Sequence, residues 1–277
     1  MSEIKCANNC GRWAGEWDEF CSICTIKLSS SIKEIIVRSD KTDQTQLRKE
    51  KEQKFKKDHE IRSLFHICHI DNLCSIIEKG LLSRQSAGVD DCKFVDIANQ
   101  GITDRRDKPK ENPLGLRLTT FASTYFEPIN GMYFGVRKPS EPEKIVIVAF
   151  KLVLSKEGIV ITDGNAAHGE SVKTSYDDHS FVKIMSEIDE LTINPPYKGE
   201  KQWEGNRKLW LDHKRRKAAE CLVPKNIRQD CIYAIHIYPD SNVEKQVKSW
   251  IVNSGLPIEI ILMPKRPTSI HDREDVI

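Results

Sequence analysis

The stretch RRKAAECLVP, Arg215–Pro224, contains the residue on which the interpretation of the whole sequence depends. A strongly basic run ends in two alanines, and a single acid, Glu220, precedes the apolar pair Leu222–Val223 and a proline. The apolar pair is typical of a strand, so Glu220 stands where a cationic helix end meets a β-segment. An unpaired carboxylate is an unfavourable choice for an apolar core. We therefore interpret Glu220 as a candidate catalytic carboxylate facing a cleft that admits a polyanion.

The 277 residues are 39% hydrophobic and 30% charged, which suffices for one large domain and a small appendage. The net charge is only +2, so local clusters must indicate any charged partner. The N-terminal residues MSEIKCANNC lack the apolar core of a secretory signal, and apolar runs such as Ile145–Phe150 are too short to span a bilayer. We expect a cytoplasmic protein without a membrane partner.

Four of the nine cysteines lie within the first 24 residues, as two close pairs with ten residues between them. Two such pairs can supply the four soft tetrahedral ligands that zinc prefers. A segment this short cannot bury a core, so a metal would have to hold it together. Four unrelated reduced cysteines are the alternative. The predicted structural zinc ligands are Cys6, Cys10, Cys21 and Cys24.

A charged connector follows this zinc-ribbon-like segment. Between Lys41 and Ser63, eight Lys or Arg residues stand against five acids in a helix-favouring pattern. Such a run is ordinarily the solvated face of a helix, and contact with a phosphate backbone is the alternative. We predict three parts, namely the zinc-ribbon-like segment 1–28, the connector 29–60 and a main domain 61–277.

The main domain opens with a strand over 64–70, where apolar and other residues alternate, and a helix that ends at Gly80. His66 and His69 are three residues apart, so they face opposite sides of a strand, and only one can point into a given cleft. A histidine on a strand also commonly has a purely structural, hydrogen-bonded role.

Residues 84–118 are rich in Gly, Asp, Asn, Arg and Pro, and the stretch Gly101–Pro113 predicts a polar loop. Arg105 and Arg106 are adjacent within it and suit a bidentate clamp on phosphates, although a solvated loop explains them equally well. Residues 121–136 are dense in aromatics around a turn, which either line a pocket or belong to the core.

Further strands are predicted in the second half of the chain. Residues 145–154 form the clearest buried strand, 158–161 a second short one, and 231–263 a strand, a helix and a final strand. The segment 168–205 between them is long, polar and punctuated by Gly and Pro. Segments of this kind inside compact domains tend to be functional.

Residues 201–217 carry seven Lys or Arg residues against two acids, with two tryptophans interleaved. Cations for phosphates and flat rings for bases are what a groove for single-stranded nucleic acid uses. The alternative is an amphipathic helix whose Leu209 and tryptophans face the core. The candidate nucleic-acid-binding residues are Trp203, Arg207, Lys208, Trp210, Arg215 and Arg216.

Five motifs occur in an order that resembles one family. They are FHICHIDNLCSIIEKGLLS, ITDRRD, TYFEPINGMYF, GIVITDGNAA and RRKAAECLVP. The series is similar to the DarT-type DNA ADP-ribosyltransferase toxins, relatives of the bacterial ADP-ribosyltransferase toxins and of the poly-ADP-ribose polymerases. The resemblance covers residues 61–265, and the cysteine-rich segment and the connector lie outside it.

The resemblance implies an α+β fold, with a split, mostly antiparallel β core, flanking helices and a cleft for NAD. It also implies that NAD is cleaved at the nicotinamide–ribose bond and that ADP-ribose is transferred to a base of single-stranded DNA, thymine or guanine. Cleavage builds positive charge on the ribose, which a preorganised carboxylate stabilises. The alternatives are transfer to RNA or protein, and an inactive zinc-ribbon protein that binds nucleic acid.

The resemblance further implies a toxin with a cognate antidote, an ADP-ribosyl hydrolase such as a macrodomain or NADAR-type protein. Glu220 matches the catalytic glutamate of the family, and Arg105 matches its arginine best by position, with Arg106 as the other candidate. Arginine-modifying relatives carry a second Glu where Ala218 stands here, which argues against arginine as the acceptor. The residues that match the NAD-binding positions are His66, with His69 as its competitor, Asn72, Tyr125, Met132 and Tyr133.

Overall fold

A computed structural model provides the three-dimensional description of the chain. The residues that it describes are 45–54, 57, 61, 63–90, 94–107, 113–176 and 215–264, with the two short strands β1 (Ile4–Lys5) and β2 (Trp13–Ala14). The chain divides into two compact units, Met1–Lys51 and Glu52–Ile277. In the first unit, β1 pairs antiparallel with β2.

The four predicted zinc ligands lie outside the described residues, as do both predicted domain boundaries, at residues 28 and 60. Residues 45–54 are helical, as the connector pattern predicts. In the second unit, the Glu52 carboxylate accepts a hydrogen bond of 2.7 Å from the backbone N–H of Ser155.

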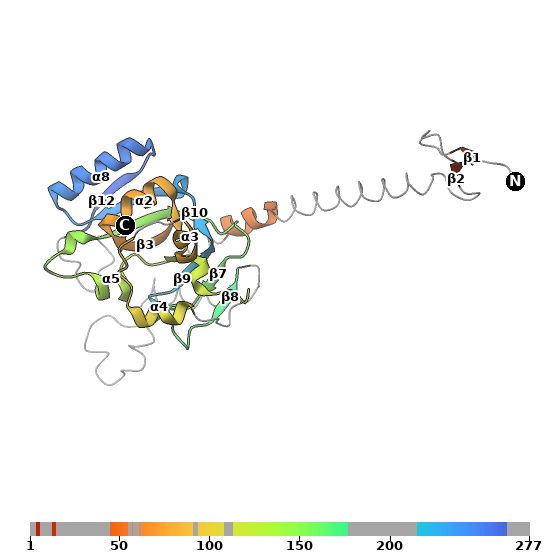
Figure 1. Cartoon of the computed structure of the whole chain (residues 1–277), viewed down its shortest axis with the longest axis horizontal. Coiled ribbons are helices and arrows are strands. Elements are labelled where there is room, and N and C mark those ends of the chain that lie inside the picture. Colours follow the sequence, from red (N-terminus) through yellow and green to blue (C-terminus); the bar gives the residue numbers. More distant parts are fainter. Residues whose placement is uncertain are drawn as a thin grey trace. The chain divides into compact units, whose positions relative to one another are not determined.

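An eight-stranded sheet forms the centre of the second unit (Figure 1). All neighbouring strands in it are antiparallel except the edge pair β11 and β12, which is parallel. From edge to edge, the strands are β12 (Glu259–Leu262), β11 (Ile232–Ile237), β6 (Ile145–Lys151), β3 (Ser63–His69), β5 (Phe121–Tyr125), β9 (Glu220–Pro224), β7 (Val160–Thr162) and β8 (Lys173–Ser175). A second, two-stranded sheet pairs β4 (Leu81–Leu82) with β10 (Asn226–Ile227).

The sheet is split between β3 and β5. Strand β3 pairs with β6 along its whole length, and β5 pairs with β9 in the same way. The two central strands, however, share a single register position, Phe65 opposite Tyr125. The two halves of the sheet therefore meet at one point and diverge beyond it. This geometry confirms the predicted split, mostly antiparallel fold.

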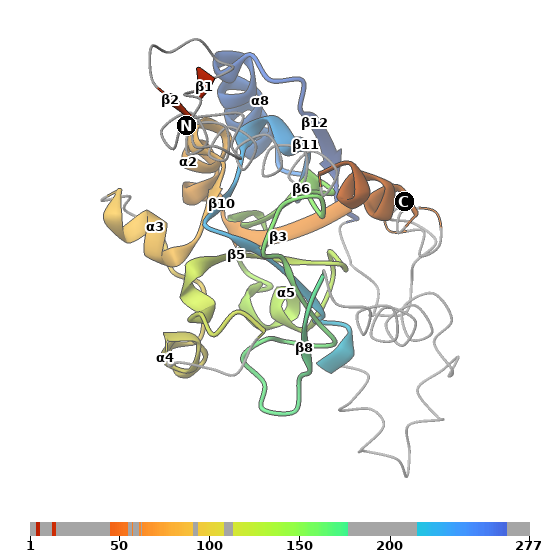
Figure 2. The ribbon, with the colours of Figure 1, turned by 90° about the vertical axis from the view of Figure 1, so that its right-hand side faces the viewer.

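Helices cover both faces of the sheet (Figure 2). The α-helices are α2 (Ile70–Lys79), α3 (Arg84–Val89), α4 (Gln100–Asp107), α5 (Gly131–Val136) and α8 (Ser241–Ser254), and the 3-10 helices are η1 (Leu118–Thr120), η2 (Pro142–Lys144) and η4 (Gln229–Cys231). Strand β6 separates two cores, because alternate side chains point to opposite faces. Val146 and Phe150 belong to the large core under α2 and α8, whereas Ile145 and Ile147 pack with Tyr133 of α5.

The strand at 64–70, the helix that ends at Gly80, the buried strand at 145–154 and the C-terminal strand, helix and strand are confirmed. The prediction of a polar loop over Gly101–Pro113 is wrong for residues 101–107, because these belong to α4. Helix α4 has no buried residue and therefore no apolar stripe by which its sequence could be recognised. Its first turn is fixed locally, since the Asn99 side chain accepts a hydrogen bond from the Gly101 N–H.

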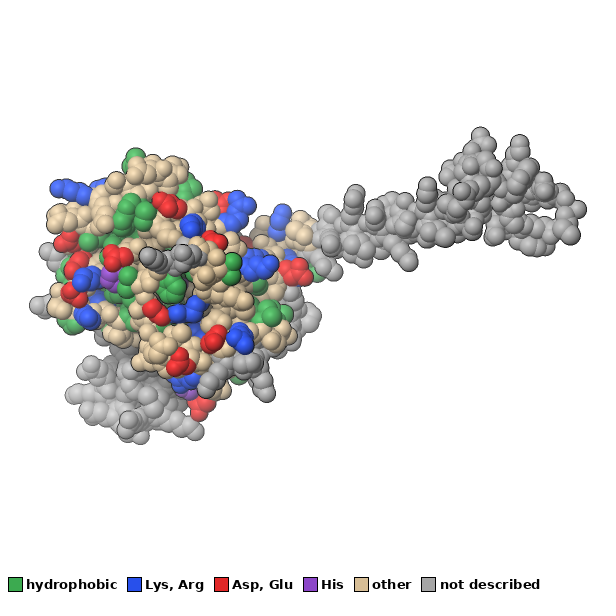
Figure 3. Space-filling view, in the orientation of Figure 1, with side chains coloured by type: hydrophobic (Ala, Val, Ile, Leu, Met, Phe, Trp, Pro, Cys, Tyr) green, Lys and Arg blue, Asp and Glu red, His purple; other side chains and the backbone are tan. Residues whose placement is uncertain are grey.

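Basic and acidic side chains are interspersed over the described part of the face shown in Figure 3. Recognition of a polyanion would therefore depend on individual contacts rather than on a broad field of one sign on this face. Within the described ranges, no helix has the length and apolar character needed to cross a membrane.

A buried histidine lies near the C-terminal end of β11. His236 is 5% exposed, its ring meets the Phe65 ring edge-on at 6.0 Å, and neither ring nitrogen has a hydrogen-bond partner among the described residues. Burial lowers the pKa of His236 to about 4, because the charged ring would be desolvated without compensation.

The free energy of unfolding should therefore decrease as the pH is lowered from about 6.5 to about 4. In this range the histidine of the unfolded chain binds a proton, whereas the buried ring of native His236 does not. The depressed pKa corresponds to about 3 kcal/mol, lost progressively over this window and constant below it. Urea denaturation across this range should show a weaker pH dependence for His236→Leu than for the wild type. Equal pH dependence in the two proteins would contradict this account.

Candidate active site

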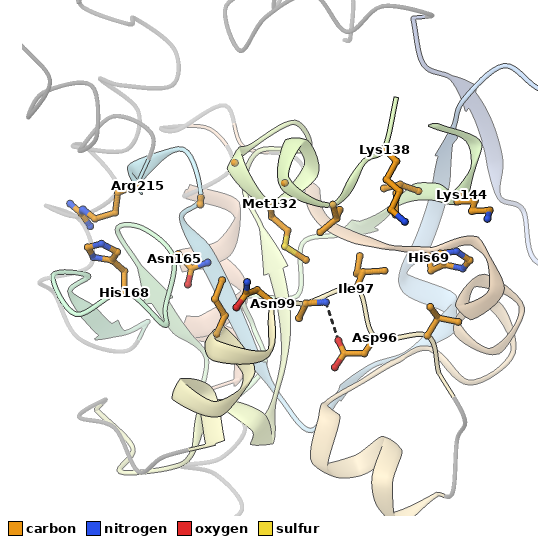
Figure 4. Close-up of a pocket in the computed structure, with 18 of the residues that line it drawn as sticks. His69, Asp96, Ile97, Asn99, Met132, Lys138, Lys144, Asn165, His168 and Arg215 are labelled. Atoms are coloured by element: carbon orange, nitrogen blue, oxygen red, sulfur yellow. Dashed lines mark hydrogen bonds between the residues drawn. The ribbon is translucent and has the colours of Figure 1, made fainter. Parts of the chain in front are cut away.

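Two adjoining cavities open at the split in the sheet. The narrow cavity, of about 240 Å³, is lined by residues that include His66, Arg106 and Tyr125. The wide cleft has a volume of about 1170 Å³ and carries Lys138 and Arg215 toward opposite ends (Figure 4). The segment 95–99 lines both cavities and forms their shared wall.

Glu220, the first residue of β9, has no exposed surface and lines neither of the two cavities. Its backbone N–H donates to Thr162 Oγ1 at 3.0 Å, and its Oε1 accepts from the Ala166 N–H at 2.8 Å. The register of β9 on β5 places it opposite Tyr125. Both the backbone and the carboxylate of Glu220 are thus fixed by the end of β7 and the turn that follows it.

Arg106 projects from α4 onto this carboxylate. Its Nη2 donates to Oε1 and Oε2 of Glu220 at 2.5 and 2.8 Å, and its Nη1 donates to Ser123 Oγ at 2.9 Å. Burial by itself would lower the pKa of Arg106, but the charge and hydrogen bonds of Glu220 contribute to an opposing effect that raises it. The guanidinium therefore stays charged and compensates the buried carboxylate.

Two further titratable groups face the narrow cavity. Burial and the charge of Glu220 raise the pKa of Tyr125, so its phenol keeps its proton at neutral pH. His66 Nδ1 lies 2.9 Å from the Ser123 carbonyl oxygen, which can only accept, so Nδ1 carries the proton. Burial lowers the pKa of His66, which the Ser123 bond offsets only in part. The neutral ring leaves Nε2 as a hydrogen-bond acceptor.

Residues 65–267 match the family model described as "ssDNA thymidine ADP-ribosyltransferase, DarT". The chain belongs to the DarT family. The match includes both Arg106 and Glu220, and the family and fold class inferred from the five motifs are confirmed.

The similar proteins include members from two genera. A DNA ADP-ribosyl transferase–DNA ADP-ribosyl glycohydrolase fusion protein of Thermosipho africanus (strain H17ap60334) is 32% identical over 204 residues, which are 71% of this chain and 47% of the relative. The solved structure of Thermosipho africanus DarTG in complex with ADP-ribose has a TM-score of 0.58 at 28% identity, covering 76% of this chain and 54% of that protein. The chain thus spans about half the length of these two DarT-family proteins.

The structure of Thermus sp. 2.9 DarT in complex with ADP-ribosylated ssDNA shares the fold, with a TM-score of 0.58 at 22% identity. It is matched over 95% of its own length and 74% of this chain. The second unit of this chain therefore contains the fold of a DarT protein over nearly the whole of that protein.

By position, the resemblance favours Arg105 over Arg106 as the arginine of the family, whereas the structure places Arg106 against Glu220. Arg105 is exposed, and its Nε donates to the Gly101 carbonyl of its own helix at 3.1 Å. Because neighbouring residues on a helix project about 100° apart, only one of the pair can face Glu220. In the DarT fold of this chain, that residue is Arg106.

The two histidines line different cavities, His66 the narrow one and His69 the wide one. His69 also caps α2, because its Nδ1 accepts from the Asp71 N–H at 3.2 Å. The Asn72 side-chain amide makes two hydrogen bonds with the Val95 backbone. Its Nδ2 donates to the Val95 carbonyl at 2.9 Å, and its Oδ1 accepts from the Val95 N–H at 2.7 Å. Asn72 therefore holds the shared wall, and because it also lines the narrow cavity, its contact with the cofactor stays a prediction.

Of the three predicted cofactor residues in the aromatic stretch, Tyr125 and Met132 line a cavity and Tyr133 belongs to the core. Met132 lines both cavities. Tyr133 is buried, lines neither cavity and packs edge-on against Phe134 with ring centroids 5.6 Å apart. The structure thus gives Tyr133 a place in the core in place of the predicted cofactor contact.

The predicted nucleic-acid-binding run lies mostly outside the described residues, including Trp203, Arg207, Lys208 and Trp210. Arg215 is described, and its guanidinium pairs with Asp163 at 2.8 Å with only 8% of the side chain exposed. The alternative that this side chain faces solvent is therefore wrong, while its contact with nucleic acid stays a prediction. The nucleic-acid role of Arg216 stays a prediction.

Several residues that build the site were missed in the sequence. Ser123 alternates with Tyr125 on β5, so the period-2 pattern of FASTY could have assigned both to one face. Thr162 and Ala166 hold Glu220 through a hydroxyl and a backbone N–H, and neither group has a sequence signature.

Replacing Arg106 with Gln should lower the free energy of unfolding by about 3–5 kcal/mol, because it leaves the fully buried Glu220 charge without a partner. The neighbouring variant Arg105→Gln should change it by less than about 0.5 kcal/mol. The double variant Arg106→Gln, Glu220→Gln should regain much of the loss. Urea denaturation at neutral pH measures all three, and equal stability of the two single variants would contradict the pairing.

Proposed function

We propose that this chain is an NAD-dependent enzyme that transfers ADP-ribose to a base of single-stranded DNA and releases nicotinamide. The observation that carries the proposal is the Arg106–Glu220 pair beside the narrow cavity, within the region that matches the DarT family. Solved DarT structures of Thermus sp. 2.9 in complex with NAD+ and with ADP-ribosylated ssDNA support both substrates. The family description names thymidine, which favours thymine over guanine as the acceptor.

The narrow cavity suits the nicotinamide riboside end of NAD. His66 is neutral there and offers Nε2 as an acceptor to a ribose hydroxyl, while Tyr125 is a protonated phenol beside the reacting groups. NAD supplies a ribose whose bond to nicotinamide is activated for cleavage. The pocket residues bind and orient that ribose, and Asn72 keeps the wall over it in place.

In the proposed reaction, the bond between ribose C1 and the nicotinamide nitrogen breaks, and nicotinamide leaves with the bonding electrons. A ring nitrogen of the acceptor base forms the new bond to C1 and releases its proton to solvent. The transition state carries positive charge on the ribose, which the Glu220 carboxylate stabilises. Arg106 does not serve as a general base, because an arginine stays protonated throughout the neutral range.

Arg106 lies between the narrow cavity and the carboxylate. Its side chain is 15% exposed and lines the narrow cavity, whereas Glu220 has no exposed surface. Arg106 therefore has to release part of its hold on Glu220 before the carboxylate can face the ribose. Until NAD binds, the same pair keeps a buried charge compensated.

The wide cleft is the proposed entrance for the acceptor strand. It meets the narrow cavity at Met132 and Asn165, so a base inserted from the wide side reaches the ribose bound on the narrow side. Ala218 lines the same cleft, two residues before Glu220. No second carboxylate stands at that position, which disfavours an arginine side chain as the acceptor. Transfer to RNA is the remaining competitor.

The activity proposed here is that of a toxin controlled by an antidote. The 32% identical relative of Thermosipho africanus joins a DNA ADP-ribosyl transferase to a DNA ADP-ribosyl glycohydrolase. This fusion supports a hydrolase that removes ADP-ribose from DNA as the cognate partner of the chain.

We further propose a structural zinc in the N-terminal segment, held by Cys6, Cys10, Cys21 and Cys24 on the strength of their spacing. Among the described residues, no group of three or more His, Cys, Asp or Glu side chains is arranged to hold a metal. The proposed zinc therefore serves the N-terminal segment, and NAD chemistry at Glu220 is assigned to the protein's own groups.

Elemental analysis of the full chain should find about one zinc per molecule. A variant with all four N-terminal cysteines changed to Ser should lose the metal, because the thiolates are its ligands. Nicotinamide release from NAD should be retained in that variant. A wild-type chain without zinc, purified under reducing conditions and without chelators, would contradict the metal assignment.

Glu220→Gln should reduce transfer of labelled ADP-ribose from NAD to single-stranded oligonucleotides by at least about 100-fold, because the neutral amide cannot stabilise charge on the ribose. Glu259→Gln, which changes an exposed acid of β12, is the matched control and should transfer at the wild-type rate. Oligonucleotides of each single base, and their RNA counterparts, identify the acceptor. Wild-type activity in Glu220→Gln would remove this carboxylate from the mechanism.

A further inference from the structure

We propose that the buried Arg215–Asp163 ion pair positions the Glu220 carboxylate, which makes Arg215 and Asp163 positioning residues for the transfer. The inference rests on the proposed function, in which Glu220 acts on the ribose. The sequence analysis predicted that the Arg215 guanidinium binds nucleic acid, whereas the structure shows it in an ion pair with Asp163. The pair reaches Glu220 through the turn Asp163–Ala167.

The ion pair is bidentate and almost fully buried. Arg215 Nη1 donates to Asp163 Oδ1 at 2.8 Å and Nη2 to Oδ2 at 3.2 Å, with 8% and 6% of the two side chains exposed. Nη1 also lies 3.4 Å from the Asp163 carbonyl oxygen and from Ser171 Oγ. Planar two-point contacts of this kind fix orientation as well as distance. The Arg215 side chain is therefore locked against the residues that follow β7.

The turn after β7 is pinned on its other side as well. Asp163 Oδ1 accepts from the Val172 N–H at 2.8 Å, and the Asp163 N–H donates to the Val172 carbonyl at 3.2 Å. Gly164 packs directly on the Arg215 side chain, because a Cβ at this position would lie 2.8 Å from Nη1 and 2.9 Å from Cγ. Arg215 and Val172 thus leave the turn no room to shift.

This turn holds the carboxylate. The Ala166 N–H donates to Glu220 Oε1 at 2.8 Å. The Thr162 hydroxyl donates to the Gly164 carbonyl at 2.5 Å while accepting from the Glu220 N–H at 3.0 Å. Every one of these bonds depends on the position of the turn between Thr162 and Ala166.

Residues 215–220 are therefore tied to the same turn at both ends. Arg215 is attached through its side chain, and Glu220 through its backbone N–H and its carboxylate. Between them, the Ala218 and Ala219 N–H groups donate to the carbonyls of Arg215 and Arg216, which makes a tight turn. The result is a closed ring in which a displacement of Arg215 is transmitted to Glu220. Figure 4 shows Arg215 beside His168, away from the labelled residues at the far end of the cleft.

The test uses Asp163→Asn, which keeps an acceptor for Val172 but removes the negative charge that holds Arg215. With saturating single-stranded DNA, kcat for transfer should fall by roughly 10- to 100-fold, because a carboxylate displaced by about 1 Å loses that much. The KM for NAD and the Kd for DNA should stay at wild-type values. Nicotinamide release without DNA should fall in parallel, since it depends on the same carboxylate.

Asp230→Asn is the matched control, because Asp230 forms a bidentate pair with Arg228 on the exposed surface. It should leave every one of these quantities unchanged. Arg215→Lys, which keeps the buried charge but not the two-point contact, should give a smaller loss of kcat than Asp163→Asn. It replaces Asp163→Asn as the test if circular dichroism shows that the latter does not fold.

Two results would overturn the inference. One is a wild-type kcat in Asp163→Asn. The other is an Arg215→Lys variant that loses DNA affinity but keeps the wild-type rate of nicotinamide release, which would make Arg215 a phosphate contact. A wild-type chain that releases nicotinamide but modifies no DNA would contradict the proposed acceptor and leave the positioning role measurable on nicotinamide release.

Discussion

The rest of the site depends on one buried charge, that of Glu220. A carboxylate with no exposed surface is tolerated only when opposite charge and hydrogen bonds surround it. Arg106 supplies the charge from α4, and Ala166 and Thr162 supply hydrogen bonds to its carboxylate and backbone. These partners come from segments far apart in the chain, so the second unit must be folded before the carboxylate is ready to act.

The split in the sheet makes this charge reachable. Because β3 and β5 share only the Phe65–Tyr125 position, the sheet opens beside the strand that carries Glu220. The segment 95–99 divides the opening into a narrow cavity and a wide cleft. A smaller substrate can thus bind on the narrow side while a longer one approaches from the wide side, an arrangement that suits the proposed transfer from a dinucleotide to a polymer.

The fold and the candidate residue Glu220 could be predicted from the order of the motifs in the sequence, because strands have a recognisable apolar periodicity. The sequence did not show which of Arg105 and Arg106 contacts Glu220. Helix α4 has no buried residue and no apolar stripe, so its sequence predicts a loop, and a loop does not show which of Arg105 and Arg106 faces Glu220. The engagement of Arg215 by Asp163 was hidden for another reason. Fifty-two residues separate the two, and only the folded chain brings them together.

The central claim is that this chain attaches ADP-ribose to a base of single-stranded DNA. The most direct measurement is mass spectrometry of the nucleosides released from a mixed-sequence single-stranded DNA after incubation with NAD and the wild-type chain. The account predicts a new nucleoside with the mass of ADP-ribosyl thymidine or its ribosyl digestion product. Unmodified DNA nucleosides, from a preparation that has consumed NAD and labelled RNA or protein instead, would contradict it.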